Sequence, residues 1–340
     1  MMFQQMWHFL PITALLFSLS DRTFAEVVQS ISDCDHYLLN HTLPHVPGIL
    51  EDGRILNQNR YKIICQTYRN RRRFVTLYDV QNKIPVFSAF RFVDQVDRKR
   101  PKTYWKIEPQ LENESTNKNM MRENKMKNYT YQASNKDYKA NNTFDRGHIF
   151  PSSYASSKED KESTFTLTNI VPQAESFNKG SWNKMEICTK CVMEKYCINS
   201  SGGTEGFVVT GAQPSLNSVL NDRVNVPSAL WSAFCCYSAV RGAWIASGHW
   251  GNNVQDESKH KYLETMTLEN LQHILGMSNS EFVMFPGTKC PLTTTVTEFY
   301  PELKNCPCPP TVSGSITSPP SHFAFIFPLF VYSYLHWVSC

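Results

Sequence analysis

The residues best suited to chemistry in this sequence of 340 amino acids lie in three blocks between Asp145 and Glu186. The first block is Asp-Arg-Gly-His at 145–148, the second is Thr-Asn-Ile-Val-Pro-Gln at 168–173, and the third is Asn-Lys-Gly-Ser-Trp at 178–182. One such tetrapeptide alone would be a weak indication of function. Three blocks in this order, with these gaps, predict a single functional site.

His148 and Asn178 suit the hydrolysis of a phosphodiester. The attacking water must lose a proton, and a neutral histidine can accept it because its ordinary pKa lies near the working pH. The leaving oxygen develops negative charge, which a divalent cation stabilises. Magnesium keeps most of its coordinated waters, so the amide oxygen of Asn178 suffices as a sole direct ligand.

This arrangement resembles the DNA/RNA non-specific endonucleases, which are ββα-metal or His-Me finger nucleases. The resemblance covers roughly residues 50–290 and is tight over 143–186. It implies that Asn178 holds Mg²⁺ (or Mn²⁺) and that Glu186 holds a metal-bound water. In a regular helix the Cα atoms of these two residues would lie about 12 Å apart along the axis, so Glu186 is expected to act only through water.

The resemblance also suggests roles for the neighbours of His148. Arg146 is expected to grip the phosphate, because its guanidinium is always charged and forms paired hydrogen bonds. Asp145 is expected to orient the loop, and Gly147 to permit a bend or a close approach of the backbone. Two further residues of the motif, Asn169 and Gln173, are expected to brace the site.

Structural roles are the alternatives for several of these residues. His148 could be a core histidine with satisfied hydrogen bonds, and Asn178 could cap a helix, a role that does not exclude metal binding. The arginines at 69 and 71–73 could form either a solvated charged surface or a surface that follows phosphates.

One departure from the family pattern concerns Thr103. Bacterial members carry an arginine shortly before a tryptophan that precedes the Asp-Arg-Gly-His block. Here the corresponding tryptophan is Trp105, and Thr103 stands where that arginine would fall. Arg100 and Lys102 are the candidate replacements and the candidate phosphate contacts. If neither replaces the arginine, turnover would be slow, so the departure affects the expected activity more than the expected fold.

Three functions are therefore considered. The first is an extracellular metal-dependent nuclease with little sequence specificity, since phosphate contacts carry no sequence information. The second is a catalytically weak or inactive binding protein on a nuclease scaffold. The third is a phosphodiesterase for small nucleotides. A net charge of +4 is too small to indicate a polyanionic partner by itself, and no protein partner can be inferred.

The two ends of the chain carry targeting patterns. Residues 1–25 are predicted to be a signal peptide, since an apolar run at 7–19 precedes small residues at Thr23 and Ala25; a buried first helix is the alternative. Residues 314–340 are predicted to be an apolar C-terminal tail: the small triplet that begins at Ser313 is followed by a short spacer and an uncharged apolar run at 323–338. This layout favours a GPI-anchor signal and membrane attachment through a lipid. A transmembrane helix or a tail docked on the domain are the alternatives.

Between these ends, the sequence predicts a non-specific endonuclease-like domain at 26–300 and a stalk rich in Pro, Cys and Ser at 301–313. Eleven cysteines favour an oxidising compartment, and removal of Cys340 with the tail leaves ten, which can pair completely. Cys188 and Cys191 could also be a redox pair or half of a zinc site, but structural disulfides are the better interpretation. Candidate glycosylation sites, in keeping with secretion, are Asn40, Asn113, Asn128, Asn141 and Asn199.

Hydrophobic patterning predicts an α+β fold with a central antiparallel sheet and flanking helices. The family resemblance implies that this fold carries a ββα-metal (His-Me finger) active-site motif. The Asn- and Lys-rich residues 108–143 are expected to form a long surface excursion, and 250–253 a plain turn. Strands are expected at 61–65, 73–78, 84–90, 165–171, 206–211, 229–237 and 243–247, and helices at 178–196 and 263–275.

Overall fold

A computed structural model describes residues 27–28, 34–139, 143–257, 262–276, 281–299, 303 and 306–308. The chain divides into two compact units, Met1–Pro309 and Pro310–Cys340. The second unit lies outside the described residues, and so do the predicted signal peptide at 1–25, the predicted lipid-anchor signal at 314–340 and the sequon at Asn141. No helix in the described ranges is long and apolar enough to span a membrane.

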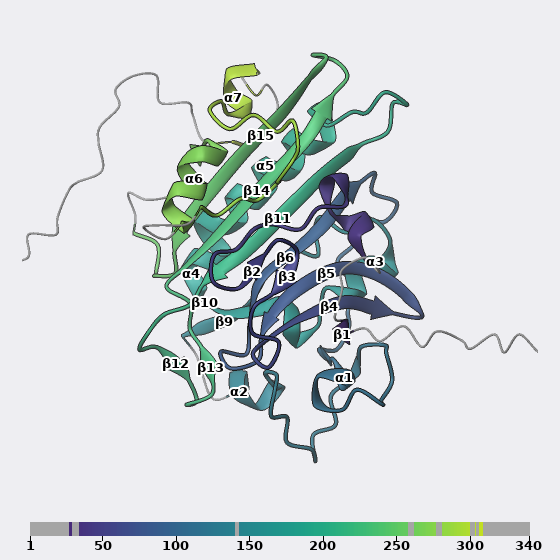
Figure 1. Cartoon of the computed structure of the whole chain (residues 1–340), viewed down its shortest axis with the longest axis vertical. Coiled ribbons are helices and arrows are strands. Elements are labelled where there is room, and N and C mark those ends of the chain that lie inside the picture. The colour runs from purple at the N-terminus through teal and green to yellow at the C-terminus, as the bar shows by residue number, and fades with distance from the viewer. Residues whose placement is uncertain are drawn as a thin grey trace, which may run out of the picture. The chain divides into compact units, whose positions relative to one another are not determined.

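An eight-stranded antiparallel sheet forms the centre of the first unit (Figure 1), in the order β1-β4-β5-β6-β11-β14-β15-β16. The predicted α+β class with a central antiparallel sheet is therefore confirmed. The strands are β1 (Val27–Val28), β4 (Tyr61–Tyr68), β5 (Arg71–Asp79), β6 (Ile84–Val93), β11 (Glu205–Gln213), β14 (Ala229–Ser238), β15 (Ala243–Asn252) and β16 (Thr265–Met266).

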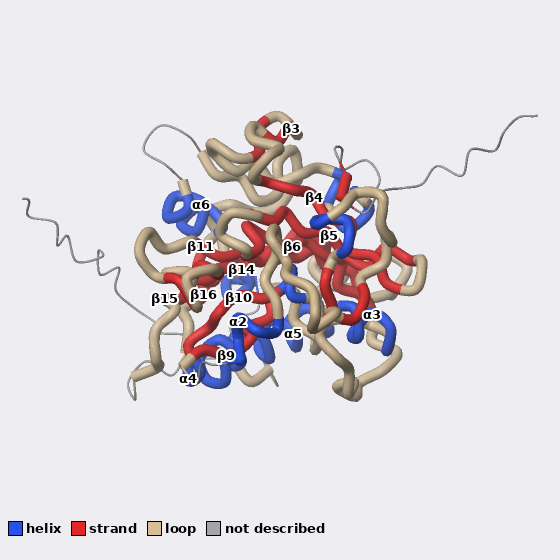
Figure 2. Tube along the Cα trace, turned by 90° about the horizontal axis from the view of Figure 1, so that it is seen from below, coloured by secondary structure: helices blue, strands red, loops and turns tan. Residues whose placement is uncertain are grey.

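The two faces of this sheet are covered by different layers. On β6, Phe87 and Ala89 pack into one hydrophobic cluster, whereas Phe90 and Phe92 pack into another, because successive side chains of a strand point to opposite faces. Figure 2 shows the sheet between these layers. One layer contains β2 (Leu50–Glu51), β3 (Arg54–Ile55) and α6 (Leu268–Leu275), and the other contains α3 (Lys158–Ser163), α4 (Glu175–Phe177), α5 (Asn183–Tyr196), β9 (Phe144–His148) and β10 (Ile170–Ala174).

Adjacent cysteines on β14 attach both layers to the sheet. Cys235 is disulfide-bonded to Cys290, and Cys236 is disulfide-bonded to Cys197, at the end of α5. Since neighbouring residues of a strand face opposite sides, one dipeptide anchors two different segments. A disulfide typically contributes about 2–4 kcal/mol by restricting the unfolded chain.

The cysteines at 188 and 191 lie one turn apart on α5 and form disulfides with the last described segment, 306–308. Cys188 pairs with Cys308, and Cys191 pairs with Cys306. With the remaining bond, Cys34–Cys65, all ten described cysteines are paired, which confirms the prediction of structural disulfides. The segment expected to be a stalk is therefore joined to the domain as far as Cys308.

Two local predictions were wrong. The segment 165–171 is not one strand: a 3-10 turn, Leu167–Asn169, precedes β10, which includes Pro172. Proline is tolerated there because β10 pairs with only one neighbour, β9, in a two-stranded sheet. The expected turn at 250–253 is largely strand, since β15 continues to Asn252.

The excursion at 108–143 is only partly exposed. Tyr129 and Tyr138 are buried in the hydrophobic cluster beneath β9 and β10. Helix α6 is also shorter than predicted, because Thr267 caps it by accepting a hydrogen bond from the backbone N–H of Asn270. The remaining elements are β7 (Lys106–Ile107), α1 (Pro109–Glu112), β8 (Met121–Arg122), α2 (Asn135–Lys139), β12 (Val219–Leu220), β13 (Val224–Asn225), α7 (Val296–Phe299) and 3-10 turns at Asp35–Tyr37 and Leu39–His41.

His249 makes the sheet sensitive to acid. It is buried on β15, its Nε2 lies 3.3 Å from the hydroxyl of Thr265, and burial lowers its pKa from 6.5 to about 4. The unfolded chain binds a proton below pH ~6.5 while the native state does not, so stability is lost as the pH falls from ~6.5 to ~4. We expect this residue to account for at most about 3 kcal/mol of that loss.

Chemical denaturation at several pH values, on the unmodified protein and on His249→Gln, checks this expectation. The free energy of unfolding of the variant should fall less steeply between pH ~6.5 and ~4. Identical pH profiles for the two proteins would contradict it.

Candidate active site

The three sequence blocks meet in one ββα unit. β9 pairs antiparallel with β10, so that His148 lies opposite Ile170 and Asp145 lies opposite Gln173. The chain then continues through α4 and one π-helical turn, Asn178–Trp182, into α5. The predicted helix at 178–196 is therefore present, but its first turn is irregular.

His148 ends β9 among aromatic rings. Its ring centroid lies 5.2 Å from that of Trp105 and 4.8 Å from that of Phe165. Its Nε2 is buried and has no hydrogen-bond partner among the described residues, so the interpretation as a satisfied core histidine is wrong. Burial, assisted by the charge of Arg100, lowers the pKa of His148 from 6.5 to about 3. The imidazole is therefore neutral at physiological pH.

Asp145 orients the side chain of Asn178. The Asn178 Nδ2 donates a hydrogen bond of 2.9 Å to the Asp145 Oδ2. Among the described residues no donor binds the Asn178 Oδ1, which leaves this oxygen available to a cation. Lys179 lies 3.5 Å from the same carboxylate oxygen of Asp145. Asn178 has helical φ and ψ of −58° and −45°, and its backbone N–H, at the end of α4, donates to the backbone oxygen of Glu175. It is therefore not the N-cap residue of the helix that follows, so the N-cap alternative is wrong.

Asp256 holds the turn that follows Asn178. Its carboxylate accepts hydrogen bonds of 2.7 Å from both the backbone N–H and the hydroxyl of Ser181. Gly180 has non-helical φ and ψ of −104° and −108°, and a Cβ there would lie 2.3 Å from the Asp256 Oδ2. Sequence reasoning missed Asp256, because it lies 75 residues beyond Ser181 and carries no local motif.

Glu186 lies half-buried on α5. Burial raises the pKa of Glu186 from 4.5 to about 8, and interactions with Trp182 and Arg100 oppose this rise only in part. Tyr154 donates a hydrogen bond of 2.9 Å to the backbone oxygen of Glu186, which fixes this turn of the helix.

Two arginines lie close to His148. The Arg146 guanidinium lies 5.6 Å from the ring centre of Trp105 and 5.2 Å from that of Tyr138, and its buried Nε has no hydrogen-bond partner in the described part of the chain. Arg100 lies 5.3 Å from the ring centre of Phe165, which itself contacts His148. Lys102 is exposed. Of the two candidate replacements for the upstream arginine, the structure brings Arg100 to the site.

The sequence profile of the DNA/RNA non-specific endonuclease family matches residues 53–278. The chain belongs to this family. It is 29% identical to the human Endonuclease domain-containing 1 protein over 281 residues, which cover 79% of this chain and 50% of that protein. The mouse protein of the same name is 27% identical over 250 residues, which cover 72% of this chain and 45% of the relative. The chain thus spans about half the length of these curated relatives.

Two further similarities are partial. A protein named Nuclease from Nostoc sp. is 36% identical over 90 residues, which cover 26% of this chain and 30% of that protein. A chain in the crystal structure of the EndoG/EndoGI complex is 18% identical, with a TM-score of 0.45, over 65% of this chain and 86% of that chain.

Three residues of the family motif, Gly147, Asn169 and Gln173, lie on or pack around the strand that carries His148. A Cβ on Gly147 would lie 2.1 Å from the Gln173 Oε1, so the predicted close approach at this glycine is present. The amide of Gln173 is buried without hydrogen-bond partners among the described residues. Asn169 accepts hydrogen bonds from the Phe150 N–H (2.9 Å) and the Ser88 hydroxyl (3.1 Å), and so ties the end of β9 to the central sheet.

Family membership implies a divalent metal ion, and the residues present fit one. Asn178 offers an amide oxygen, Glu186 offers a carboxyl group, and the His148 Nε2 is buried without a partner. In the described ranges no group of three or more His, Cys, Asp or Glu side chains is placed to bind a metal. A cation at Asn178 would therefore keep most of its coordinated waters, as Mg²⁺ prefers.

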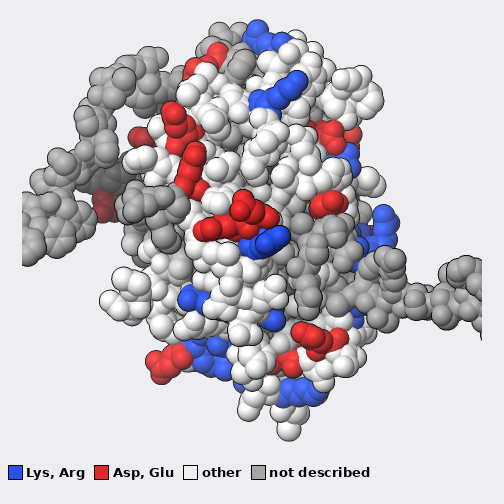
Figure 3. Space-filling view, in the orientation of Figure 1, with Lys and Arg blue, Asp and Glu red and all other residues white. Residues whose placement is uncertain are grey.

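The basic residues at 69–73 lie on a charged surface rather than at the site. Arg69 pairs with Glu159 at 3.1 Å, and Arg73 pairs with Asp160 at 2.5 Å. The side chain of Arg69 is 57% exposed, which fits a solvated charged surface, whereas that of Arg73 is only 6% exposed. Because both are paired with carboxylates, neither fits a surface that follows phosphates. On the face seen in Figure 1, acidic and basic side chains alternate and form no continuous basic surface (Figure 3).

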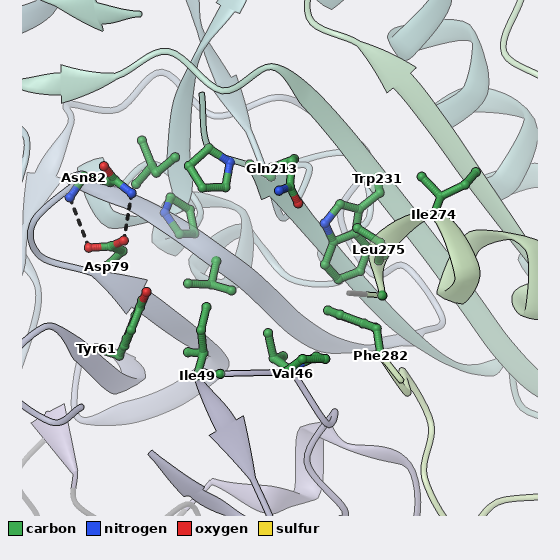
Figure 4. Close-up of a pocket in the computed structure, with 18 residues that line it drawn as sticks. Val46, Ile49, Tyr61, Asp79, Asn82, Gln213, Trp231, Ile274, Leu275 and Phe282 are labelled. Carbon is green, nitrogen blue, oxygen red and sulfur yellow. Dashed lines mark hydrogen bonds between the residues drawn. The ribbon is translucent and has the colours of Figure 1, made fainter. Parts of the chain in front are cut away.

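A cavity of about 340 Å³ lies on the other face of the sheet (Figure 4). Its walls are mainly apolar and include Val46, Trp231 and Phe282. The carboxylate of Asp79 at its edge already accepts hydrogen bonds from Arg60 (2.7 Å) and from the Asn82 side chain (2.8 Å). This cavity contains none of the motif residues and is not the catalytic site.

Proposed function

We propose that this chain is an extracellular metal-dependent nuclease that hydrolyses phosphodiester bonds of DNA and RNA with little sequence specificity. The main support is a single ββα unit that combines a neutral, unpartnered imidazole with an amide oxygen oriented by Asp145. Family membership supports the nuclease activity itself.

In this proposal His148 accepts a proton from the attacking water. Its lowered pKa keeps one ring nitrogen unprotonated throughout the physiological range. Arg146 and Arg100 stabilise the additional negative charge of the phosphate in the transition state. Arg146 is partly buried close to two aromatic rings, which reduces solvent screening of its charge, and Arg100 lies over the ring of Phe165. Asn178 would hold the divalent cation directly and Glu186 would hold its coordinated waters; the cation would supply Lewis acidity for the leaving group.

The extracellular part of the proposal rests on disulfides and exposed sequons. Five disulfides join all ten described cysteines, as is usual for proteins of oxidising compartments. Asn40, Asn113 and Asn128 are exposed, which glycosylation requires, and Asn199 is half-buried.

A catalytically weak binding protein is the second candidate, and Thr103 favours it. The hydroxyl of Thr103 lies 3.4 Å from the Lys106 Nζ and offers no positive charge where bacterial relatives carry arginine. In this case Arg100 would fail to replace that arginine.

Cleavage assays decide between the two. The purified mature chain is incubated with plasmid DNA and with RNA, in magnesium, in manganese and in a chelator. We expect cleavage of both substrates in either metal and none in the chelator. Binding of both nucleic acids without cleavage in either metal would support the binding protein and end the nuclease proposal.

A further inference from the structure

Beside the catalytic motif, an exposed aromatic ring lies close to two cations. Tyr104 is 46% exposed. The Arg122 guanidinium lies 5.5 Å from its ring centre, and the Lys106 ammonium lies 5.1 Å from it. Rings and guanidinium planes are the surfaces on which proteins stack unpaired bases.

This arrangement is held rigidly. β7 and β8 pair so that Lys106 lies directly opposite Arg122, which fixes the segment around residue 122 next to Tyr104. The Lys106 Nζ is fully buried and donates a hydrogen bond of 2.6 Å to the backbone oxygen of Glu162. A rigid platform loses little conformational entropy when it binds a ligand.

The exposed cations of this region form no close ion pairs with described residues. Arg100, Lys102 and Arg122 form no ion pair with any carboxylate in the described part of the chain. By contrast, Arg69, which follows β4, and Arg73, on β5, are both paired with acidic residues of α3. Unpaired positive charge on a surface favours an anionic ligand, and the phosphates of a nucleic acid supply such charge.

The platform formed by Tyr104 and Arg122 adjoins Trp105, a residue that contacts His148. Trp105 follows Tyr104 directly, and its ring lies 5.2 Å from that of His148. Because consecutive Cα atoms are about 3.8 Å apart, the backbone that carries Tyr104 borders the residue that contacts His148. We therefore expect nucleotides adjoining a phosphate at His148 to come within reach of Tyr104.

We propose that Tyr104 and Arg122 form a stacking site for an unpaired base of the substrate, so that single-stranded or locally unpaired nucleic acid is the preferred substrate. A base inside a duplex is stacked between its neighbours and must be unstacked before it can occupy this site, which disfavours a duplex as the ligand. The inference rests on the proposed function, because it extends the substrate site of the nuclease.

Binding measurements in the His148→Ala background test the inference without cleavage. A labelled single-stranded DNA oligonucleotide and the duplex of the same sequence are titrated by fluorescence anisotropy. Tyr104→Leu, which keeps an apolar side chain but no ring, should weaken single-strand binding by about 10-fold or more, since stacking contributes about 1–3 kcal/mol per base. Duplex binding should change by less than about 3-fold, and Tyr104→Phe should bind like the parent.

Tyr131→Leu is the matched control, because Tyr131 is also 46% exposed and lies at a separate cavity lined by Val27 and Lys62. Equal losses for single strand and duplex, or a Tyr104→Leu protein that binds like Tyr131→Leu, would overturn the stacking site. If the unmodified chain binds single strands through Tyr104 but cleaves nothing, the nuclease proposal fails while the stacking site stands. If the unmodified chain cleaves nucleic acid and Tyr104→Leu weakens the binding of neither the single strand nor the duplex, the nuclease proposal stands and the stacking site fails.

Discussion

Replacing His148 with alanine should lower the rate of phosphodiester cleavage by about 10²–10⁴-fold, the usual cost of losing a general base. The structure explains why the fold should survive. The His148 Nε2 makes no hydrogen bond with any described residue, so the change breaks none there. The ring contacts Trp105 and Phe165, whose loss we expect to cost only about 1 kcal/mol of stability.

His249→Gln is the matched control for this experiment. His249 is also a buried histidine with a lowered pKa, but it lies on β15 of the central sheet, outside the ββα unit. We expect cleavage by this variant to remain close to that of the unmodified protein at neutral pH. Single-turnover rates and thermal midpoints on both variants provide the comparison. A His148→Ala protein that cleaves at the unmodified rate would remove His148 from the mechanism.

Replacing Asn178 with alanine should reduce cleavage by about 100-fold or more and weaken metal binding, because its Oδ1 is the direct ligand that we propose. Asn178→Asp keeps an oxygen there but replaces the Nδ2 donor. The new carboxylate would meet the Asp145 Oδ2, which now accepts a hydrogen bond at 2.9 Å. Two carboxylates at this distance repel each other, so we expect the new side chain to turn away from its native position.

The exchange Asp145→Asn with Asn178→Asp separates charge from orientation. It restores one donor and one acceptor at the same two positions and keeps the net charge. Because the turned side chain no longer presents its oxygen to the cation, we expect Asn178→Asp to bind manganese more weakly than the unmodified protein. We expect the double variant to recover most of this lost affinity. The added charge at 178 also opposes the approach of phosphate, so its turnover should stay below that of the unmodified protein.

Calorimetric titration with manganese, thermal midpoints and single-turnover rates distinguish these effects. Unchanged rates for Asn178→Ala at saturating magnesium would exclude the metal-ligand role. A double variant that binds manganese no better than Asn178→Asp would show that the hydrogen bond to Asp145 does not orient residue 178.

The sequence alone identified the catalytic unit because its parts are close along the chain. All three blocks fall between Asp145 and Glu186, and a hairpin followed by a helix needs only local contacts to form. Alternating apolar residues likewise predicted the long strands β4, β5 and β6, since period-2 patterning depends on neighbouring residues alone.

The errors arose where tertiary contacts override local preference. Pro172 was expected to end a strand, yet it lies inside β10, because a strand with a single partner tolerates a residue without an N–H. Gly251 and its neighbours were expected to form a turn. They extend β15 instead, where a Cβ on Gly251 would lie 2.7 Å from the ring of Phe177, so the glycine serves close packing.

The sequence by itself thus determined the family, the ββα unit and the residue types available for catalysis, because these depend on side-chain identity and short spacings. Only the tertiary structure decided which distant residues complete the site. Asp256 reaches Ser181 across 75 positions, Arg100 and not Lys102 lies beside Phe165, and the cysteines pair in one of many possible ways. Such contacts follow from how the two layers pack on the sheet, and no local pattern encodes that packing.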